Sequence, residues 1–278
     1  MALKKNISVQ LPEAYNVPEK DISKYTLMFF GEKKCGKTSL AAQFPDHFIL
    51  EFEPGNAAHL NCRFADVHNW EETLAYIALL KENKDYCKTL VIDDIPSVYE
   101  YCMNQVRKDL GKAETDKPGF DGYDVCKRRF NQLIKDIQTL PFGKIYTAHD
   151  KIRDCELRGG GTISQLETSM SGQCKEILDK YITLTGYIKK DNKNERIMQI
   201  EGDKFIKANN GFKNHFLKPD ETKITDIPLG TSPEMGYSNL IKAYHNELYK
   251  IKVKPKVRIN KENMEANTNA KRHTLSEL

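Results

Sequence analysis

Short runs of apolar residues alternate along the chain with longer stretches in which apolar residues recur every three or four positions. A short apolar run without polar alternation predicts a strand that is buried on both faces of a sheet. Such runs occupy residues 25–30, 47–52, 89–92 and 144–148. Strands that alternate with helical connections are typical of α/β proteins, so we predict a mainly parallel sheet flanked by helices.

The connections between these strands carry the predicted helices. Residues 39–44 predict the start of a helix that ends near Pro45. Residues 70–81 and 123–140 each place their apolar side chains on one helical face, as crossover helices packed on a sheet do. From Tyr237 onward, a further apolar stripe predicts a helix that reaches Ile251.

The pattern changes at about residue 180. Apolar stretches at 181–190 and 196–201 flank a short polar run, and a third stretch follows at 204–208. This spacing predicts an antiparallel β-meander appended to the sheet. Residues 209–236 are rich in Asn, Gly, Pro and Thr, and we expect them to form a surface loop.

Composition excludes several classes of protein. No apolar run approaches the roughly 20 residues that a membrane helix needs, and the first residues lack the apolar centre of a signal peptide. The seven cysteines are spread singly, with no pair at metal-binding spacing. We therefore expect a cytoplasmic protein with reduced thiols that has no contact with a membrane.

Charge is unevenly distributed along the 278 residues. The formal net charge is only +4, which does not by itself indicate a nucleic-acid binder. Residues 250–278, however, contain eight Lys/Arg and three Glu, a local charge of +5, and residues 187–218 carry +4. The basic end is either a tether for nucleic acid or an acidic partner, or a solubilising tail.

The strongest chemical signal directly follows the first predicted strand. GEKKCGKT fits the phosphate-loop pattern G-x-x-x-x-G-K-[ST], between a strand and a helix. Backbone N–H groups of such a loop point at phosphate oxygens, so we expect ATP, with Lys37 on the β- and γ-phosphates and the Thr38 hydroxyl on Mg²⁺. The predicted nucleotide-binding residues are Gly31, Glu32, Lys33, Lys34, Cys35, Gly36, Lys37, Thr38 and Ser39.

Carboxylates follow two further strands. Asp93 ends one apolar run, and we assign it to the metal through water; Asp94 either orients the nucleophile or caps the segment after it. Glu51 and Glu53 are alternative candidates for activating the attacking water, and they point to opposite faces of their strand. We favour Glu53, because a Pro-Gly turn after it marks the carboxyl end of the strand, where parallel sheets bind ligands.

His149 directly follows the fourth predicted strand, and we expect it to contact the γ-phosphate and to report its loss to the next segment. That segment, 151–172, contains three consecutive glycines and is predicted to be a mobile loop, either a DNA-binding loop or an active-site lid. A second long loop at 108–122 precedes a basic cluster that either contacts phosphates or is a solvated helix face. The candidate DNA contacts are Lys127, Arg128, Arg129, Lys151, Arg153 and Arg158.

In order, these parts resemble the RecA-like ATPase core, and most closely the short phage RecA-like proteins of the AAA-type ATP-binding or single-strand annealing class. The motifs that carry the resemblance are GEKKCGKTS, ILEFEPG, TLVIDD, GYDVCKRRFNQLIKDI, IYTAHDK and RIMQIEGDKFIKANNGF. The resemblance implies that both long loops face DNA, and that a closing hairpin reaches a neighbouring subunit's ATP through Lys207 or Lys204. In two places the chain departs from the family: His149 replaces a Gln, and Asn209-Asn210 stand where a basic residue is expected.

The resemblance predicts a Mg²⁺-dependent, DNA-stimulated ATPase that binds single-stranded DNA and assists recombination, annealing or repair. It implies a homo-oligomer, as a ring or filament, a single-strand-binding protein as partner, and the host cytoplasm if a phage encodes the chain. The parts are an N-terminal arm (1–23), a RecA-like P-loop NTPase core (24–218), a C-terminal loop and helix (219–251), and a disordered basic tail (252–278). Two alternatives share the phosphate loop: a small-molecule or nucleotide kinase, and a helicase-loader or packaging motor.

Overall fold

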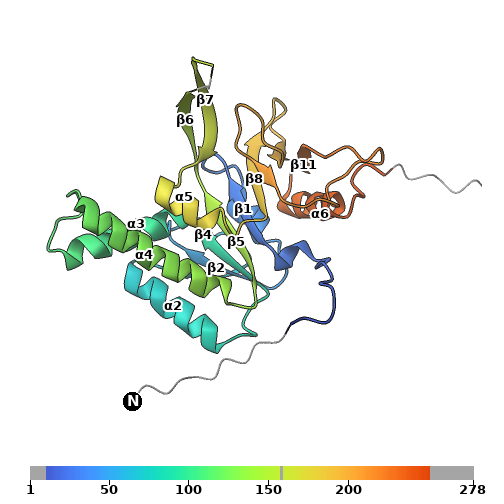
Figure 1. Ribbon diagram of the computed structural model, residues 1–278. Helices are drawn as coiled ribbons and strands as arrows, with labels where there is room; N and C mark the ends of the chain where they lie inside the picture. Colours follow the sequence, from blue (N-terminus) through green and yellow to red (C-terminus); the bar gives the residue numbers. More distant parts are fainter. Residues whose placement is uncertain (1–10, 157–158, 251–278) are drawn as a thin grey trace, which may run out of the picture.

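The computed structural model describes residues 11–156 and 159–250 and is shown in Figure 1. Its strands are β1 (Thr26–Phe30), β2 (His47–Glu51), β3 (Arg63–Asp66), β4 (Thr89–Asp93), β5 (Gly143–Ala148), β6 (Asp150–Glu156), β7 (Thr162–Thr168), β8 (Leu184–Lys190), β9 (Arg196–Gln199), β10 (Asn209–Asn210) and β11 (Asp226–Gly230). Its helices are the 3-10 turn η1 (Ile22–Lys24), α1 (Lys37–Ala41), α2 (Trp70–Glu82), α3 (Ile95–Asp109), α4 (Gly119–Gln138), α5 (Gly172–Leu178) and α6 (Pro233–Tyr244). Among the residues described, no helix is both long and apolar enough to cross a membrane.

A single large sheet forms the centre of the molecule. Its strands follow the order β11-β9-β8-β1-β5-β4-β2-β3, with β10 beside β8. The six strands β8, β1, β5, β4, β2 and β3 run parallel to one another, whereas β9 and β10 pair antiparallel with β8, and β11 pairs antiparallel with β9. The prediction of a mainly parallel α/β sheet is therefore confirmed, and the carboxyl ends of the parallel strands meet at one edge.

Helices cover both faces of this sheet, which explains why the strands are apolar without alternation. Met28 and Phe30 of β1 pack in the core beneath α2, α3, α4 and α5. Leu27 and Phe29 point the other way, into a second core with α1 and α6. Burying an apolar side chain of this size stabilises a fold by roughly 1.5–3 kcal/mol, so the four predicted runs hold the two layers together.

Most of the predicted elements are present, with shifted ends. The four strand predictions correspond to β1, β2, β4 and β5, and the helices at 70–81 and 123–140 correspond to α2 and α4. α4 begins at Gly119, four residues before the predicted start, so the basic cluster at 127–129 lies in its interior. The loop predicted at 108–122 is correspondingly short, since α3 extends to Asp109.

The mobile loop predicted after β5 is wrong for most of its length. β6 and β7 instead pair as a hairpin, in register from Asp150 with Thr168 to Glu156 with Thr162. Ile152 in β6 and Thr162, Ile163 and Thr168 in β7 have branched side chains that favour extended backbone, and the glycines lie in the connection between the strands. In Figure 1 the hairpin projects from the body of the molecule.

The C-terminal part differs from the predicted meander in three ways. β8 pairs in parallel with β1 as well as antiparallel with β9, because residues 179–183 bring it beside the central strand. The stretch 204–208 does not join the large sheet, and its Ile206 instead bridges to Leu166 of the hairpin. The loop predicted at 209–236 contains β10, β11 and the start of α6; the predicted tail lies outside the described residues.

Candidate active site

The phosphate-loop sequence forms a tight turn between β1 and α1. Gly31 and Gly36 have φ angles of +152° and +104°, a region that favours glycine. A Cβ atom added to Gly31 would lie 2.2 Å from the carbonyl oxygen of Ile188, so no other residue fits there without a backbone shift. The loop therefore packs closely against the backbone of β8.

Lys37 extends from the first turn of α1 back across this loop. Its side chain is buried, and Nζ donates to the carbonyl oxygens of Gly31 at 3.0 Å and Glu32 at 2.9 Å. The same Nζ atom lies 3.5 Å from Nδ1 of His149. The ammonium thus lies between the loop and the end of β5, where it can meet an anion.

Asp93 accepts hydrogen bonds from two hydroxyl groups, one in the first turn of α1 and one near the end of β5. Thr38 Oγ1 donates to Asp93 Oδ2 at 2.6 Å, and Thr147 of β5 donates to Oδ1. β5 lies between β1, which leads into the phosphate loop, and β4, which ends at Asp93. Thr147 of β5 is therefore placed between the loop and the Asp93 carboxylate. A hydroxyl beside a buried carboxylate is an oxygen donor set that fits Mg²⁺.

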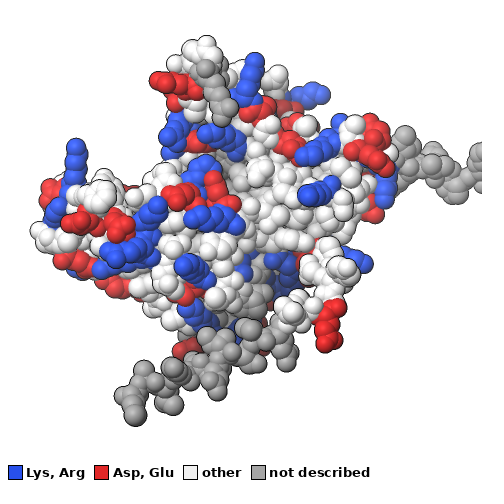
Figure 2. Space-filling model, viewed as in Figure 1, with Lys and Arg blue, Asp and Glu red and all other residues white. Residues whose placement is uncertain are grey.

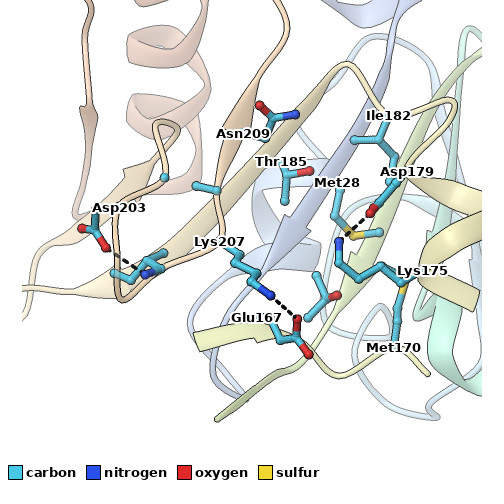
Figure 3. Close-up of a pocket in the computed structure, with 14 residues that line it drawn as sticks. Met28, Glu167, Met170, Lys175, Asp179, Ile182, Thr185, Asp203, Lys207 and Asn209 are labelled. Carbon is cyan, nitrogen blue, oxygen red and sulfur yellow. Dashed lines mark hydrogen bonds and ion pairs between the residues drawn. The ribbon is translucent and has the colours of Figure 1, made fainter. Parts of the chain in front are cut away.

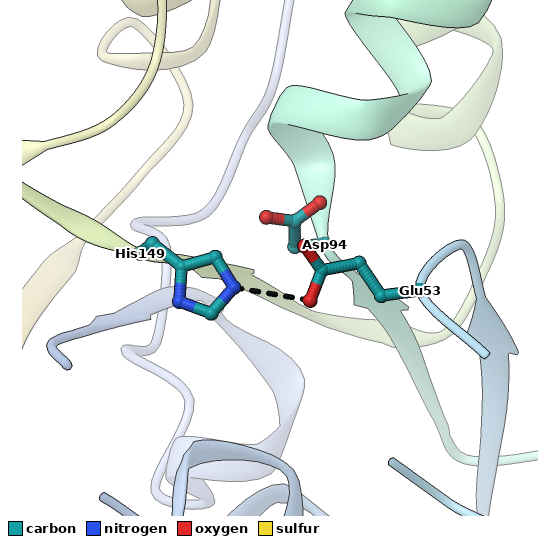
Figure 4. A group of neighbouring side chains, drawn as sticks. All are labelled: Glu53, Asp94 and His149. Carbon is teal, nitrogen blue, oxygen red and sulfur yellow. Dashed lines mark hydrogen bonds and ion pairs between the residues drawn. The ribbon is translucent and has the colours of Figure 1, made fainter. Parts of the chain in front are cut away.

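Glu53, Asp94 and His149 meet at the ends of β2, β4 and β5 (Figure 4), with ligand atoms within 4.8 Å of one another. Nε2 of His149 lies 3.1 Å from Oε2 of Glu53. Burial would raise the pKa of Glu53, but the hydrogen bond and charge of His149, with the charge of Lys33, outweigh it and hold the pKa below its usual value. Glu53 is therefore an ionised carboxylate with a defined partner.

Asp94 caps the segment that follows it, which is the second of the two roles predicted for it. Its carboxylate accepts a hydrogen bond from the backbone N–H of Ser97 at 3.1 Å and caps the N-terminus of α3. Burial raises the pKa of Asp94, and the hydrogen bonds from Ser97 offset this only in part. This carboxylate stabilises the helix that follows β4 while lying beside Glu53.

The two alternative glutamates have different surroundings. Glu51 is buried and accepts the backbone N–H groups of Asn56 at 2.5 Å and Ala57 at 2.7 Å, so it holds the turn that follows β2. Burial raises the pKa of Glu51. Glu53, in contrast, lines the cavity beside the phosphate loop. Of the two, only Glu53 faces the space where a nucleotide would bind.

This cavity has a volume of about 220 Å³ and lies between the phosphate loop and the ends of β2, β4 and β5. Most of the predicted loop residues line it, as do Asp93 and His149; Gly31, Glu32 and Cys35 do not. Cys35 is buried beneath the loop, and burial raises the pKa of its thiol. The lining residues that the sequence analysis missed are Asn56, His59 and Arg196.

The three missed residues differ in how far the sequence alone could have indicated them. Asn56 and His59 directly follow the Pro-Gly turn after β2, so their place at the carboxyl edge could have been inferred from that turn. Arg196 starts β9, and its Nε donates to the carbonyl oxygen of Cys35 at 2.9 Å. Only the basic charge of the region 187–218 hinted at it.

The candidate DNA contacts on α4 are paired with acidic residues. The ion pairs are Lys127 with Glu176 at 2.9 Å, Arg128 with Asp124 at 3.3 Å, and Arg129 with Asp109 at 2.5 Å. Figure 2 shows blue and red side chains intermingled over α3 and α4, without a patch of one sign. This arrangement favours the solvated helix face over a phosphate-binding surface.

Lys151, Arg153 and Lys207 surround one buried carboxylate, that of Glu167, at distances of 3.8, 3.3 and 3.3 Å. Burial would raise the pKa of Glu167, but the hydrogen bonds and charges of Lys207, Arg153 and Lys151 hold it below its usual value. Lys207 lines a second cavity of about 280 Å³, shown in Figure 3, and not the nucleotide cavity of its own chain. Arg158 lies outside the described residues.

A glycine turn, a buried lysine, and a threonine paired with a strand-end carboxylate together define a P-loop nucleotide-binding fold. Residues 23–212 match the model of the AAA domain family. The match covers well over half of the chain, which therefore belongs to this family of P-loop ATPases, proteins that bind and hydrolyse nucleotides. No curated protein matches the chain in sequence.

Proposed function

We propose that this protein is a RecA-like ATPase that binds single-stranded DNA and assists recombination, annealing or repair, as a homo-oligomer encoded by a phage. The observation that carries the ATPase part is the meeting of Lys37, Thr38, Asp93 and Glu53 around one cavity. Glu53 accepts the proton of the attacking water, and Lys37 binds the β- and γ-phosphates. Thr38 and Asp93 would hold Mg²⁺, which supplies charge neutralisation at the phosphates.

His149 connects this site to the β6–β7 hairpin. It directly precedes β6, and its carbonyl oxygen accepts the N–H of Ser169, which directly follows β7, at 2.7 Å. Both ends of the hairpin are therefore fixed at a residue that contacts Glu53 and lies beside Lys37. A change at the γ-phosphate that moves His149 moves the base of the hairpin with it.

The hairpin carries a third strand-like segment, which widens its surface. Leu166 N donates to Phe205 O at 2.7 Å, and Lys207 N donates to Leu166 O at 2.9 Å. Side chains alternate between the faces of an extended strand, so Phe205 and Lys207 share a face with Glu167. Lys151 lies opposite Glu167 in the register and joins the same face.

This face combines aromatic and cationic side chains. Phe205 is half exposed, and the ammonium of Lys204 lies 4.7 Å from the centre of its ring. Arg153 and Lys207 beside it keep partly exposed cationic groups, although each also contacts Glu167. Aromatic rings on which bases stack, beside cations that meet phosphates, are the usual platform for single-stranded DNA. We accordingly assign Lys207 to this platform in its own chain.

The test is the ATPase rate with and without single-stranded DNA across a salt series, combined with DNA affinity. We expect the rate to rise with DNA, the affinity to fall steeply with salt, and Phe205→Ala to weaken DNA binding about fivefold or more. Phe64→Ala, which removes a partly exposed phenylalanine of β3, serves as the control. If the protein transfers phosphate to a small acceptor and DNA has no effect on its rate, it is a kinase instead. Electron microscopy of the protein with DNA distinguishes a ring or filament from a monomer.

A further inference from the structure

Arg196 lies on the phosphate loop, although it is 161 residues away from Cys35 in the sequence. Its Nε atom donates to the Cys35 carbonyl oxygen at 2.9 Å, and a Cβ atom added to Gly36 would lie 2.9 Å from the same nitrogen. The side chain also lines the nucleotide cavity together with Lys37 and Thr38. The start of β9 thus contributes directly to the site.

Most N–H donors of the Arg196 guanidinium have no acceptor among the described residues. Arginine has five N–H donors in a planar fork, and Nε accounts for one of them. Within residues 11–156 and 159–250, Arg196 forms no ion pair, and its other nitrogens make no hydrogen bond. In contrast, Arg129 and Arg153 each have a carboxylate partner within 3.3 Å. Arg196 is therefore a cation that lines the cavity and has no ion-pair partner within the described residues.

We propose that Arg196 binds the polyphosphate of a nucleoside di- or triphosphate in its own chain and thereby fastens the β8–β9 hairpin to the bound nucleotide. Lys33, Lys34 and Lys37 line the same cavity, and a cluster of cations selects a polyanion and not an uncharged base. The planar fork suits phosphate oxygens, which it can contact through two N–H groups at once. This inference rests on the nucleotide-binding part of the proposed function and is independent of DNA.

A competing role for Arg196 is purely structural, as a clamp on the Cys35 carbonyl. The experiment titrates the full-length protein with a fluorescent ADP derivative and measures its thermal unfolding with and without ADP. We expect Arg196→Gln to weaken ADP binding about tenfold or more, since hydrogen bonds to charged groups are the strong ones, and to reduce the ADP-induced rise in unfolding temperature. Arg196→Lys should recover part of the affinity, and Lys193→Gln, an exposed change in the adjoining turn, should leave it unchanged.

The possible outcomes separate the two roles. An Arg196→Gln protein that unfolds at a lower temperature without ADP, yet binds ADP as tightly as the wild type, acts only as a clamp and overturns the proposal. If Arg196→Gln does not fold, Arg196→Lys decides, because wild-type affinity in a variant without the planar fork would likewise overturn it. If the wild type itself binds no nucleotide, the proposed function is overturned together with this proposal. If the wild type and Lys193→Gln bind ADP and Arg196→Gln binds it equally well, only this proposal is overturned.

Discussion

The imidazole Nε2 of His149 lies 3.1 Å from the carboxylate Oε2 of Glu53, and its Nδ1 lies 3.5 Å from the ammonium of Lys37. One residue therefore contacts the group that would activate water and lies beside the group that would bind the γ-phosphate. The same residue begins the backbone of the hairpin. This geometry makes the ionisation of Glu53 dependent on the side chain at position 149.

Replacing His149 should change the pH dependence of hydrolysis. The contacts of His149 hold the pKa of Glu53 below its usual value against the opposing effect of burial. In His149→Asn, burial is no longer offset to the same degree, so the pKa of Glu53 rises. We expect the acid limb of the kcat profile to move to higher pH. His68→Asn, an exposed change outside the cavity, should leave the limb in place; a lower kcat with an unmoved limb would contradict this reasoning.

The two glutamates near the end of β2 should respond differently to substitution. Glu53→Gln removes the carboxylate that we propose as the general base, so ATP hydrolysis should fall by about a hundredfold or more while ADP affinity and unfolding temperature stay close to wild type. Glu51→Ala leaves the N–H groups of Asn56 and Ala57 without their acceptor, and unfolding free energy should fall by about 1–3 kcal/mol. ATPase assays and urea unfolding distinguish the two variants. If Glu51→Ala instead lost hydrolysis at unchanged stability and Glu53→Gln lost stability, the roles assigned to the two glutamates would be reversed.

Local sequence was enough to predict the centre of the molecule. β1 and β4 are buried along their whole length, so both appear as apolar runs, and the phosphate loop is encoded within eight consecutive residues. α3 carried a readable signal that the prediction missed. Its buried residues recur at helical spacing, and Asp94 and Pro96 mark its start.

Contacts between distant residues could not be read in the same way. Glu53 and His149 are 96 residues apart, and their hydrogen bond depends on the order of the strands in the sheet. The hairpin β6–β7 was hidden because polar residues occupy both of its faces, which removes the alternation that identifies a half-buried strand. Arg196 reaches the nucleotide cavity only because β8 folds back beside β1.

The hydroxyl of Thr147 should affect the proposed Mg²⁺ site through its hydrogen bond to Asp93. It donates to Oδ1 of Asp93, whose other oxygen accepts from Thr38. Thr147→Val keeps the shape of the side chain and removes this donor, so we expect ATPase activity to need about 10–100 times more Mg²⁺, as is usual when a partner of a ligand is lost. Thr89→Val removes a hydroxyl from the opposite end of β4 and should lower stability without changing the Mg²⁺ requirement. Equal Mg²⁺ curves for both variants would show that Thr147 has only a packing role.

Lys144 should make the stability of the fold rise with pH. It is buried beside the end of α4, where Nζ donates to the Leu140 carbonyl oxygen at 2.8 Å, and burial lowers its pKa to about 8. Below that pH, the folded state has to hold a buried charge that the unfolded chain exposes to water. Between about pH 8 and the ordinary lysine pKa of about 10.4, the unfolded state binds more protons than the folded one, so the unfolding free energy increases with pH.

The measurement compares urea unfolding of wild type and Lys144→Met at pH 7 and pH 10. Methionine has no charge to bury, so the wild type should gain up to about 2.5 kcal/mol relative to the variant over this interval. Lys84→Met removes an exposed lysine and should show a difference from wild type that does not change with pH. If the difference for Lys144→Met is equally flat, the ammonium of Lys144 is solvated in the folded protein, and its contact with the Leu140 carbonyl oxygen does not lower its pKa.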